Sequence, residues 1–331
     1  MLALLPLFAV QPEILLLESA PMRALALLIA VSLLQLSGSA ALAAEPSEAA
    51  GGHTFTMLVY NVHGLFPLIA KDDPRNRMPT IGWLSNRYPV VLLQKDFEYH
   101  NILAAQLEDS VGYRGNGMGW DPRLVLAKIL ISPVAIFLPH FSPPYGAGVT
   151  TFAEKPIEIT EVERVRYARC NGWFGANGDC WARKGFLMTR LRFPDGAEVD
   201  FYNTHLEAGP TPRSVSVRSS QFVEIGDGIE RLSPGRAVIA AGDFNVAFIR
   251  PGDRDMMMDF RERVQLDDTG AAPELPLWRE RGFVLYRSGD KTRLTVEASG
   301  EAKEFVSENG SRALSDHAGL WVRVRAEAVA P

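Results

Sequence analysis

The sequence predicts an α/β fold in which helices accompany one or two β-sheets. Eight apolar runs of strand length recur along the chain, and stretches with helical spacing lie between them. The runs are 55–61, 90–94, 148–152, 185–191, 198–203, 237–241, 283–286 and 320–324. With 331 residues, of which 47% are hydrophobic and 22% charged, the chain can bury a large core in one domain or two.

Two segments between these runs predict helices. Asn101 can cap a helix over 101–107, because an asparagine side chain accepts a hydrogen bond from the free N–H groups of the first turn. The segment 214–232 approximates a single apolar face. The residues of that face are Val217, Phe222, Val223, Ile225 and Ile229.

Residues 1–44 are typical of a leader segment. Met22-Arg23 opens a short basic region, an apolar stretch follows over 24–36, and 41–43 reads Ala-Leu-Ala, a cleavage pattern. We therefore expect Met22 to be the true start and the protein to be exported, either to the periplasm or out of the cell. The alternative is an uncleaved anchor, although this apolar stretch is shorter than the ~20 residues that span a bilayer.

The remaining boundaries follow from composition. Residues 45–54 are small, acidic and glycine-bearing and predict a linker, the folded domain is expected over 55–326, and 327–331 form a tail. The net charge of −5 provides no overall attraction to a nucleic-acid backbone. A local basic patch remains compatible with this charge, so nucleic acid is a less favoured partner rather than an excluded one.

Cys170 and Cys180 are the only cysteines, and they lie in a glycine-rich stretch typical of a loop. In an exported protein a disulfide between them is favoured over free thiols. Closing so short a loop would stabilise the fold by roughly 2.5–3 kcal/mol in the chain-entropy description. Two cysteines with no histidine near in sequence do not make a zinc site.

The segment 124–138 is the most apolar part of the chain after the leader. Lys128 and Pro133 interrupt it, and it is too short to cross a bilayer. A buried helix is one interpretation. An exposed apolar element that contacts a membrane surface is another, and a lid or partner surface is a third.

Three short polar clusters each adjoin an apolar run, and together they supply carboxylates, amides and imidazoles. They are Asn203-Thr204-His205-Leu206, Gly242-Asp243-Phe244-Asn245 and Ser315-Asp316-His317. Asp243 and Asn245 lie two apart, so both can project to one face while Phe244 packs on the other. This set suits metal-assisted attack on a phosphodiester. His63 and His100 lie near the ends of other runs, where they can line a substrate entrance.

With Val59-Tyr60-Asn61-Val62 and Gln94, the clusters resemble, in order, the motifs of the endonuclease/exonuclease/phosphatase superfamily. The resemblance covers about Phe55 to Arg325. It implies a four-layer α/β sandwich, with two packed mixed β-sheets flanked by helices and an active site at one edge of the sheet pair.

Finer features are similar to the bacterial sphingomyelinase-like branch. They are Gly148-Val149, Lys155-Pro156-Ile157, Arg183-Lys184-Gly185-Phe186, His205-Leu206-Glu207-Ala208 and Pro212-Arg213-Ser214-Val215. This similarity implies a secreted, magnesium-dependent hydrolase of phospholipase C type that acts on a phosphocholine-bearing lipid. An endonuclease or a phosphatase of the same superfamily is the alternative.

The resemblance also implies roles for individual residues. Asn61, Asp243 and Asp316 would hold the metal, and Asn245 with Asp243 would contact the phosphate. His317 would be the general base, and His205 would hydrogen-bond a phosphate oxygen or protonate the leaving alkoxide. His100 is a further candidate for substrate binding. Hard oxygen ligands suit Mg²⁺ or Mn²⁺.

Lys95 breaks this pattern, because relatives carry a metal-binding glutamate directly after the residue matched by Gln94. An ammonium group repels a divalent cation and can pair with Asp243 or Asp316 instead. Asp96 or Glu98 could substitute only through a bulge or turn. An acid that orients the catalytic histidine is also missing from 281–286, unless Asp290 takes its place. An impaired homologue that only binds its ligand is therefore a further alternative.

Overall fold

The computed structural model describes residues 52–65, 67–70, 72, 74–114, 147–172, 179–270 and 281–329. The chain divides into two units, 1–49 and 50–331, and all described residues belong to the second. The expected leader over 1–44, most of the expected linker, and the apolar segment 124–138 lie outside the described residues. The strand β1 (His53–Gly64) begins within the range expected as linker.

Two six-stranded sheets form the centre of the fold. The first has the order β11-β12-β1-β2-β4-β3 and the second β5-β6-β7-β8-β10-β9. The first consists of β1, β2 (Val90–Asp96), β3 (Ser110–Arg114), β4 (Thr150–Glu154), β11 (Thr292–Ala302) and β12 (Gly319–Ala328). The second consists of β5 (Glu158–Arg166), β6 (Gly185–Arg192), β7 (Glu198–His205), β8 (Val238–Val246), β9 (Asp267–Asp268) and β10 (Arg281–Arg287).

Both sheets are mixed. The pairs β1–β2 and β7–β8 are parallel, whereas the other neighbouring strands are antiparallel. Parallel neighbours need a crossover between them, and helices supply it in each sheet. The segment between β1 and β2 contains α2 (Pro67–Ala70) and α3 (Pro74–Ser85), and the segment between β7 and β8 contains α7 (Pro212–Leu232).

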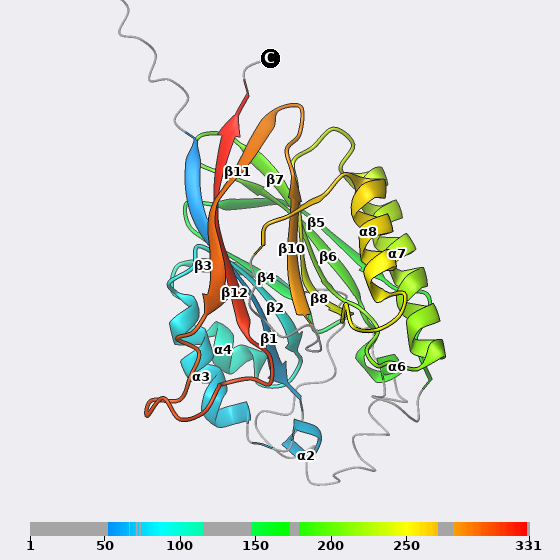
Figure 1. Cartoon of the computed structure of the whole chain (residues 1–331). Coiled ribbons are helices and arrows are strands. Elements are labelled where there is room, and N and C mark those ends of the chain that lie inside the picture. Colours follow the sequence, from blue (N-terminus) through cyan, green and yellow to red (C-terminus); the bar gives the residue numbers. More distant parts are fainter. Residues whose placement is uncertain are drawn as a thin grey trace, which may run out of the picture. The chain divides into compact units, whose positions relative to one another are not determined.

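Helices cover the outer face of each sheet, which completes four layers (Figure 1). Helices α3 and α4 (His100–Ala104) pack on the first sheet, and α7 and α8 (Asp253–Val264) pack on the second. The short helix α6 (Asp179–Ala182) precedes β6. The predicted sandwich is thus confirmed. Among the described residues, no helix combines the length and the apolar character that crossing a bilayer requires.

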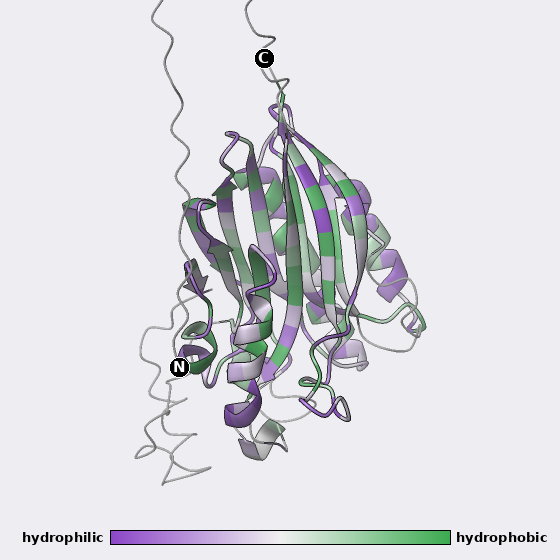
Figure 2. Cartoon of the chain, turned by 90° about the vertical axis from the view of Figure 1, so that its left-hand side faces the viewer, coloured by the Kyte–Doolittle hydropathy of each residue, from purple (hydrophilic) through white to green (hydrophobic). Residues whose placement is uncertain are grey.

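The space between the sheets is filled by alternate residues of their central strands. Val59 and Leu92 from one sheet meet Phe201 and Ile239 from the other, and all are buried. Figure 2 shows the result of this alternation as hydrophobic and hydrophilic bands along the strands. Burial of this apolar area, at about 25 cal/mol per Å², is the main force that joins the two sheets.

All eight predicted strands are present, each longer or shifted by a few residues. The strands β3, β5, β9 and β11 and the helices α2, α3, α6 and α8 were not predicted. Strand β5 carries a polar, largely exposed sequence at a sheet edge, and α3 contains Pro79, so neither has the expected pattern. The predicted cap at Asn101 is wrong. Helix α4 begins at His100, and the residue before it, Tyr99, has no capping side chain.

A buried ion pair joins helices α7 and α8 beneath the second sheet. The Arg218 Nη2 atom donates to Asp253 Oδ1 at 2.7 Å, and its Nη1 atom donates to the carbonyl oxygens of Glu207 and Gly209. Both side chains of the pair are fully buried. Arg250 Nε also contacts Asp253, at 2.7 Å from Oδ2, so loss of Arg218 would leave Asp253 Oδ1 and the two carbonyl oxygens without their donor in a buried site.

We therefore expect Arg218→Met to lower the free energy of unfolding by about 3–5 kcal/mol. The matched control is Arg263→Met on the exposed side of the same helix pair, where Arg263 contacts Asp227 and Glu230. That change should cost less than about 1 kcal/mol, because water screens exposed ion pairs. Urea unfolding followed by circular dichroism measures both, and equal losses would contradict a special role for the buried pair.

Candidate active site

The polar clusters meet because the strands that carry them end at one edge of the sandwich. The parallel pair β1–β2 and the parallel pair β7–β8 each bring two carboxyl ends together. Strand β12 is antiparallel to β1, so the segment that precedes it lies at the same edge. Gly242 permits the close approach of β7 and β8. A Cβ atom there would lie 2.0 Å from the Thr204 carbonyl oxygen, and its φ is 143°.

Asp243 is the residue on which the other polar groups converge. Its Oδ2 atom accepts a 2.8 Å hydrogen bond from Asn61 Nδ2, and its Oδ1 atom accepts one from the Asn245 backbone N–H at 3.0 Å. Asn61 and Asp243 come from opposite sheets, so this bond crosses the sandwich. Phe244, between the two polar residues, is buried against Phe222 and Phe260 as predicted.

Two imidazoles lie beside the same carboxylate. His205 Nε2 is 3.7 Å and His317 Nε2 is 3.8 Å from Asp243 Oδ2. Burial raises the pKa of an acid, but electrostatic interactions with the two imidazoles and with the ammonium groups of Lys95 and Lys184 outweigh it and lower the pKa of Asp243. Asp243 is therefore ionised at neutral pH.

His205 is buried, and neither of its ring nitrogens has a hydrogen-bond partner within the described residues. Burial, together with the positive charge of Lys184, lowers its pKa well below the usual value, so the ring is neutral at pH 7. Two unpaired buried ring nitrogens are costly without a ligand. This makes His205 the described group best prepared to hydrogen-bond a bound anion.

Asp316 and His317 occupy the loop before β12. His63 Nδ1 lies 3.0 Å from Asp316 Oδ1, and Lys95 Nζ lies 3.9 Å from Asp316 Oδ2. His317 Nε2 is 3.8 Å from Asp316 Oδ1 as well. Burial would raise the pKa of Asp316, but the contact with His63 and the charges of Lys95 and His317 lower it overall.

Arg77 holds this loop in place, a contribution that the sequence did not reveal. Its guanidinium donates to the carbonyl oxygens of Val62 and His63 at the end of β1 and to that of Leu314 before the loop. Ser315 adds a bond from its hydroxyl to the Asn61 carbonyl oxygen at 2.6 Å. The Asp316–His317 segment is thereby fixed relative to Asn61.

A second hydrogen bond, between the side-chain amides of Gln94 and Asn203, also joins the two sheets. Gln94 Nε2 donates to Asn203 Oδ1 at 2.8 Å, and Asn203 Nδ2 donates to the carbonyl oxygens of Leu93 and Thr150. These bonds use the NH₂ groups of both amides, and they hold the two sheets together. Asn245 has φ 53° and donates from Nδ2 to the Leu206 carbonyl oxygen at 2.8 Å. Asparagine tolerates this left-handed conformation better than most residues.

His100 does not join the cluster around Asp243. Its Nδ1 atom lies 2.5 Å from Asp96 Oδ2, and its ring stacks on Phe152. The Thr150 hydroxyl donates to the same Asp96 oxygen at 2.6 Å. Asp96 is fully buried, and His100 and Thr150 both contact its Oδ2 atom.

The suggested shift to Asp290 is wrong. Because β10 is antiparallel to β8, Gly282 lies opposite Asp243 and Arg287 lies opposite Val238. Asp290 follows β10 and donates its backbone N–H to the Gly235 carbonyl oxygen, at the other end of the sheet. It therefore lies far from the histidines along the strand direction.

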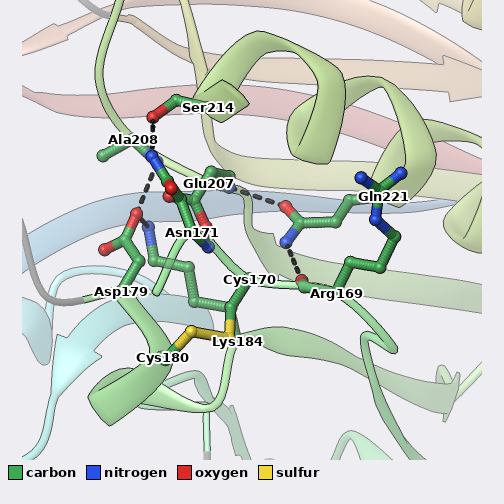
Figure 3. The surroundings of a disulfide bond; sticks show 10 residues. All are labelled: Arg169, Cys170, Asn171, Asp179, Cys180, Lys184, Glu207, Ala208, Ser214 and Gln221. Carbon is green, nitrogen blue, oxygen red and sulfur yellow. Dashed lines mark hydrogen bonds and ion pairs between the residues drawn. A yellow bond between two sulfur atoms is a disulfide. The ribbon is translucent and has the colours of Figure 1, made fainter. Parts of the chain in front are cut away.

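Figure 3 shows a buried ionic cluster that the sequence did not reveal. Two of its members, Lys184 and Asp179, interact electrostatically with His205. Lys184 Nζ donates to Asp179 Oδ2 at 3.0 Å and to the Leu206 carbonyl oxygen at 2.6 Å. Glu207 accepts a bond from the Asn171 N–H, and its own N–H donates to Gln221 Oε1. The sequence did contain a signal for this ion pair. Lys184 directly precedes the apolar run over 185–191, and Asp179 lies five residues before it.

The predicted disulfide between Cys170 and Cys180 is present, with the Cα atoms 5.1 Å apart. It closes the loop that carries Asn171 and Asp179, and Figure 3 shows it beside the Asp179–Lys184 pair. The loop reaches helix α7 through Asn171 Nδ2, which donates to Ser214 Oγ at 2.8 Å. The disulfide therefore braces one wall of the buried cluster.

The described side chains do not fit a magnesium ion. Among them, no group of three or more acidic, histidine or cysteine side chains is arranged to hold a metal. Asp243 already accepts from Asn61 and Asn245, and Asp316 is contacted by His63 and Lys95. Magnesium requires several oxygen ligands in near-octahedral geometry. The ammonium of Lys95 stands where the resemblance expects a carboxylate.

We expect Glu207→Gln to stabilise the protein at alkaline pH. Burial and the neighbouring Asp179 raise the pKa of Glu207 from 4.5 to about 8. A raised acid pKa keeps the proton in the folded state, so stability falls as pH rises from about 4.5 to 8. Glutamine has the same shape and no charge, so it avoids this loss.

The measurement is the melting temperature of both proteins between about pH 5 and pH 9. The difference in favour of Glu207→Gln should be small at the acid end and grow toward the alkaline end. Glu163→Gln, on the edge strand β5, is the surface control and should give no such trend. A difference that is constant with pH would contradict the shifted titration.

No family model matches the chain. The chain is similar to the sphingomyelinases of Mycobacterium tuberculosis and Mycobacterium bovis, with 28% identity over 289 residues. The aligned part is 82% of this chain and 52% of each relative, so the chain spans about half the length of these curated relatives.

Solved structures show the same fold. An endonuclease/exonuclease/phosphatase family protein from Bacteroides thetaiotaomicron has a TM-score of 0.58 at 16% identity, covering 83% of this chain and 98% of that one. Sphingomyelinase C from Streptomyces griseocarneus has a TM-score of 0.55 at 19% identity, covering 82% of this chain and 99% of that one. The chain therefore has the fold of the endonuclease/exonuclease/phosphatase proteins and is similar in sequence to the mycobacterial sphingomyelinases.

Proposed function

We propose that this protein is an exported phosphodiesterase that hydrolyses a phosphocholine-bearing lipid of the sphingomyelin type. The observation that carries the proposal is the approach of two imidazoles to the ionised Asp243, with His205 and His317 each within 3.8 Å of its Oδ2 atom. Imidazoles beside a fixed carboxylate can accept and donate protons and hydrogen bonds during attack on a phosphate ester.

Each group has a place in the proposed reaction. His317 accepts a proton from the attacking water, and Asp243 and Asp316 stabilise the imidazolium that forms. His205 donates a hydrogen bond to a non-bridging phosphate oxygen. A bond forms between the water oxygen and phosphorus, the bond to the lipid oxygen breaks, and that oxygen takes up the proton that His317 accepted from the water. One water is consumed, and an alcohol and a phosphomonoester are released.

The roles of the amides follow from the same geometry. Asn61 orients Asp243 through its 2.8 Å bond, so it positions the carboxylate without contact to substrate. The left-handed backbone of Asn245 brings its N–H to Asp243 and its side chain to the Leu206 carbonyl, next to His205. In this proposal Asn245 aligns the second histidine with the phosphate.

Two observations favour lipid over nucleic acid. The relatives found by sequence are sphingomyelinases, and the net charge of −5 does not attract a polyanion. The Cys170–Cys180 disulfide supports export, since such bonds persist in oxidising compartments. The apolar segment 124–138 is proposed as a contact to the membrane surface, where the lipid resides.

We expect purified protein to release phosphocholine from sphingomyelin vesicles, and His317→Gln to lower the rate by about 10²–10⁴-fold, because removal of a general base has effects of that size. His205→Gln should lower it as well. The matched control is His53→Gln, the same change at the opposite end of β1, which should keep activity near wild type. Released phosphocholine is measured by an enzyme-coupled colour reaction.

Three outcomes would replace the proposal. Cleavage of plasmid DNA without action on lipid would assign the protein to the nucleases of the superfamily. Action on phosphomonoesters alone would make it a phosphatase. Saturable binding of lipid without release of product, by a folded wild type, would make it a binding protein that has lost catalysis.

A further inference from the structure

Lys95 lies at an irregular point in the first sheet. Strands β1 and β2 pair from Met57 and Val90 up to Asn61 and Gln94, and the next pair is Gly64 with Asp96, so the register shifts at Lys95. Its φ is 49°, a left-handed conformation that is uncommon for a residue with a long side chain. Such strain persists where the surroundings require it and is concentrated at functional sites.

At this irregularity the Lys95 side chain takes a different direction from the side chains of Gln94 and Asp96. Gln94 points into the sandwich and bonds to Asn203, and Asp96 is fully buried against Thr150 and His100. The Lys95 side chain extends instead toward the loop before β12, where its Nζ atom lies 3.9 Å from Asp316 Oδ2. About a fifth of the side chain is exposed, so a ligand can reach it.

The ammonium acts on the same groups that surround Asp243. Its charge contributes to the lowered pKa values of Asp243, Asp316 and His205. A divalent cation bound between the two carboxylates would therefore stand close to a positive charge of the protein itself, which opposes its binding. The same ammonium attracts a phosphate group and offers it three N–H donors.

We propose that Lys95 supplies the positive charge that binds the phosphate group in this site, in place of a divalent cation, so that phosphate binding is independent of Mg²⁺ and Mn²⁺. The inference rests on the proposed function for the location of the phosphate. Lys95 donates to a non-bridging oxygen from the side of Asp316, and His205 donates from the side of Asp243. The phosphate lies between a fixed cation and a buried neutral donor.

The test is the binding of phosphocholine, measured by isothermal titration calorimetry in excess EDTA and again in millimolar MgCl₂. The wild type should bind equally well in both. Lys95→Met, which keeps an unbranched side chain and removes the charge, should weaken binding by about tenfold or more, as expected for loss of a charged hydrogen bond. Lys95→Arg, which keeps the charge, is the matched control and should stay much closer to wild type.

Lys95→Glu adds a readout that needs no substrate. It should bind Mn²⁺, seen as loss of the free-ion signal in electron paramagnetic resonance, whereas the wild type should leave that signal unchanged. Thermal unfolding of each variant confirms that it is folded. Phosphocholine binding by the wild type only with Mg²⁺, stoichiometric Mn²⁺ binding by the wild type, or unchanged binding by Lys95→Met would each overturn the inference.

The two proposals fail separately. If the wild type binds phosphocholine in EDTA but releases none from sphingomyelin, the proposed role of Lys95 is supported and the proposed phosphodiesterase activity is contradicted. If it hydrolyses sphingomyelin only in the presence of Mg²⁺, the phosphodiesterase proposal stands and the inference about Lys95 is overturned.

Discussion

The hydrogen bonds that cross the sandwich at one edge are the constraint on which the site depends. Asn61 donates to Asp243, and Gln94 donates to Asn203, each at 2.8 Å and each between the two sheets. These polar groups are buried, so an unpaired one would cost about 1–3 kcal/mol. The sheets must therefore meet in one register at this edge. Apolar packing brings the sheets together, but it is not directional, so it fixes their relative position less strictly than the hydrogen bonds do.

Charge is distributed around this edge in two levels. The buried level contains the Asp179–Lys184 pair with Glu207, and the level nearer to solvent contains Asp316, His63 and Lys95. His205 and Asp243 lie between them. Burial alone would neutralise Asp243, and the surrounding cations keep it ionised. The site thus carries its own positive charge, and Lys95 contributes to it from beside Asp316.

Much of the fold was predictable, because central strands buried on both faces leave continuous apolar runs in the sequence. Strands β1, β2, β7 and β8 were found in this way. The edge strand β5 and helix α3 were not found, because the former is largely polar and the latter contains Pro79. Asn101 failed as a cap because His100, paired with Asp96, already belongs to the helix.

The sequence by itself determined which residues adjoin the strand ends, and so it determined that Asn61, Asp243, His205 and His317 would meet. Parallel strands place their carboxyl ends at a common edge, so short motifs at those ends are enough to predict that their residues converge. Only the tertiary structure decided which contacts the residues around these four make. Asp96 is buried by Thr150, Lys184 reaches the back of the site, and a left-handed residue turns Lys95 toward Asp316. These placements depend on side-chain contacts between distant segments and on one backbone angle, which a linear pattern does not encode.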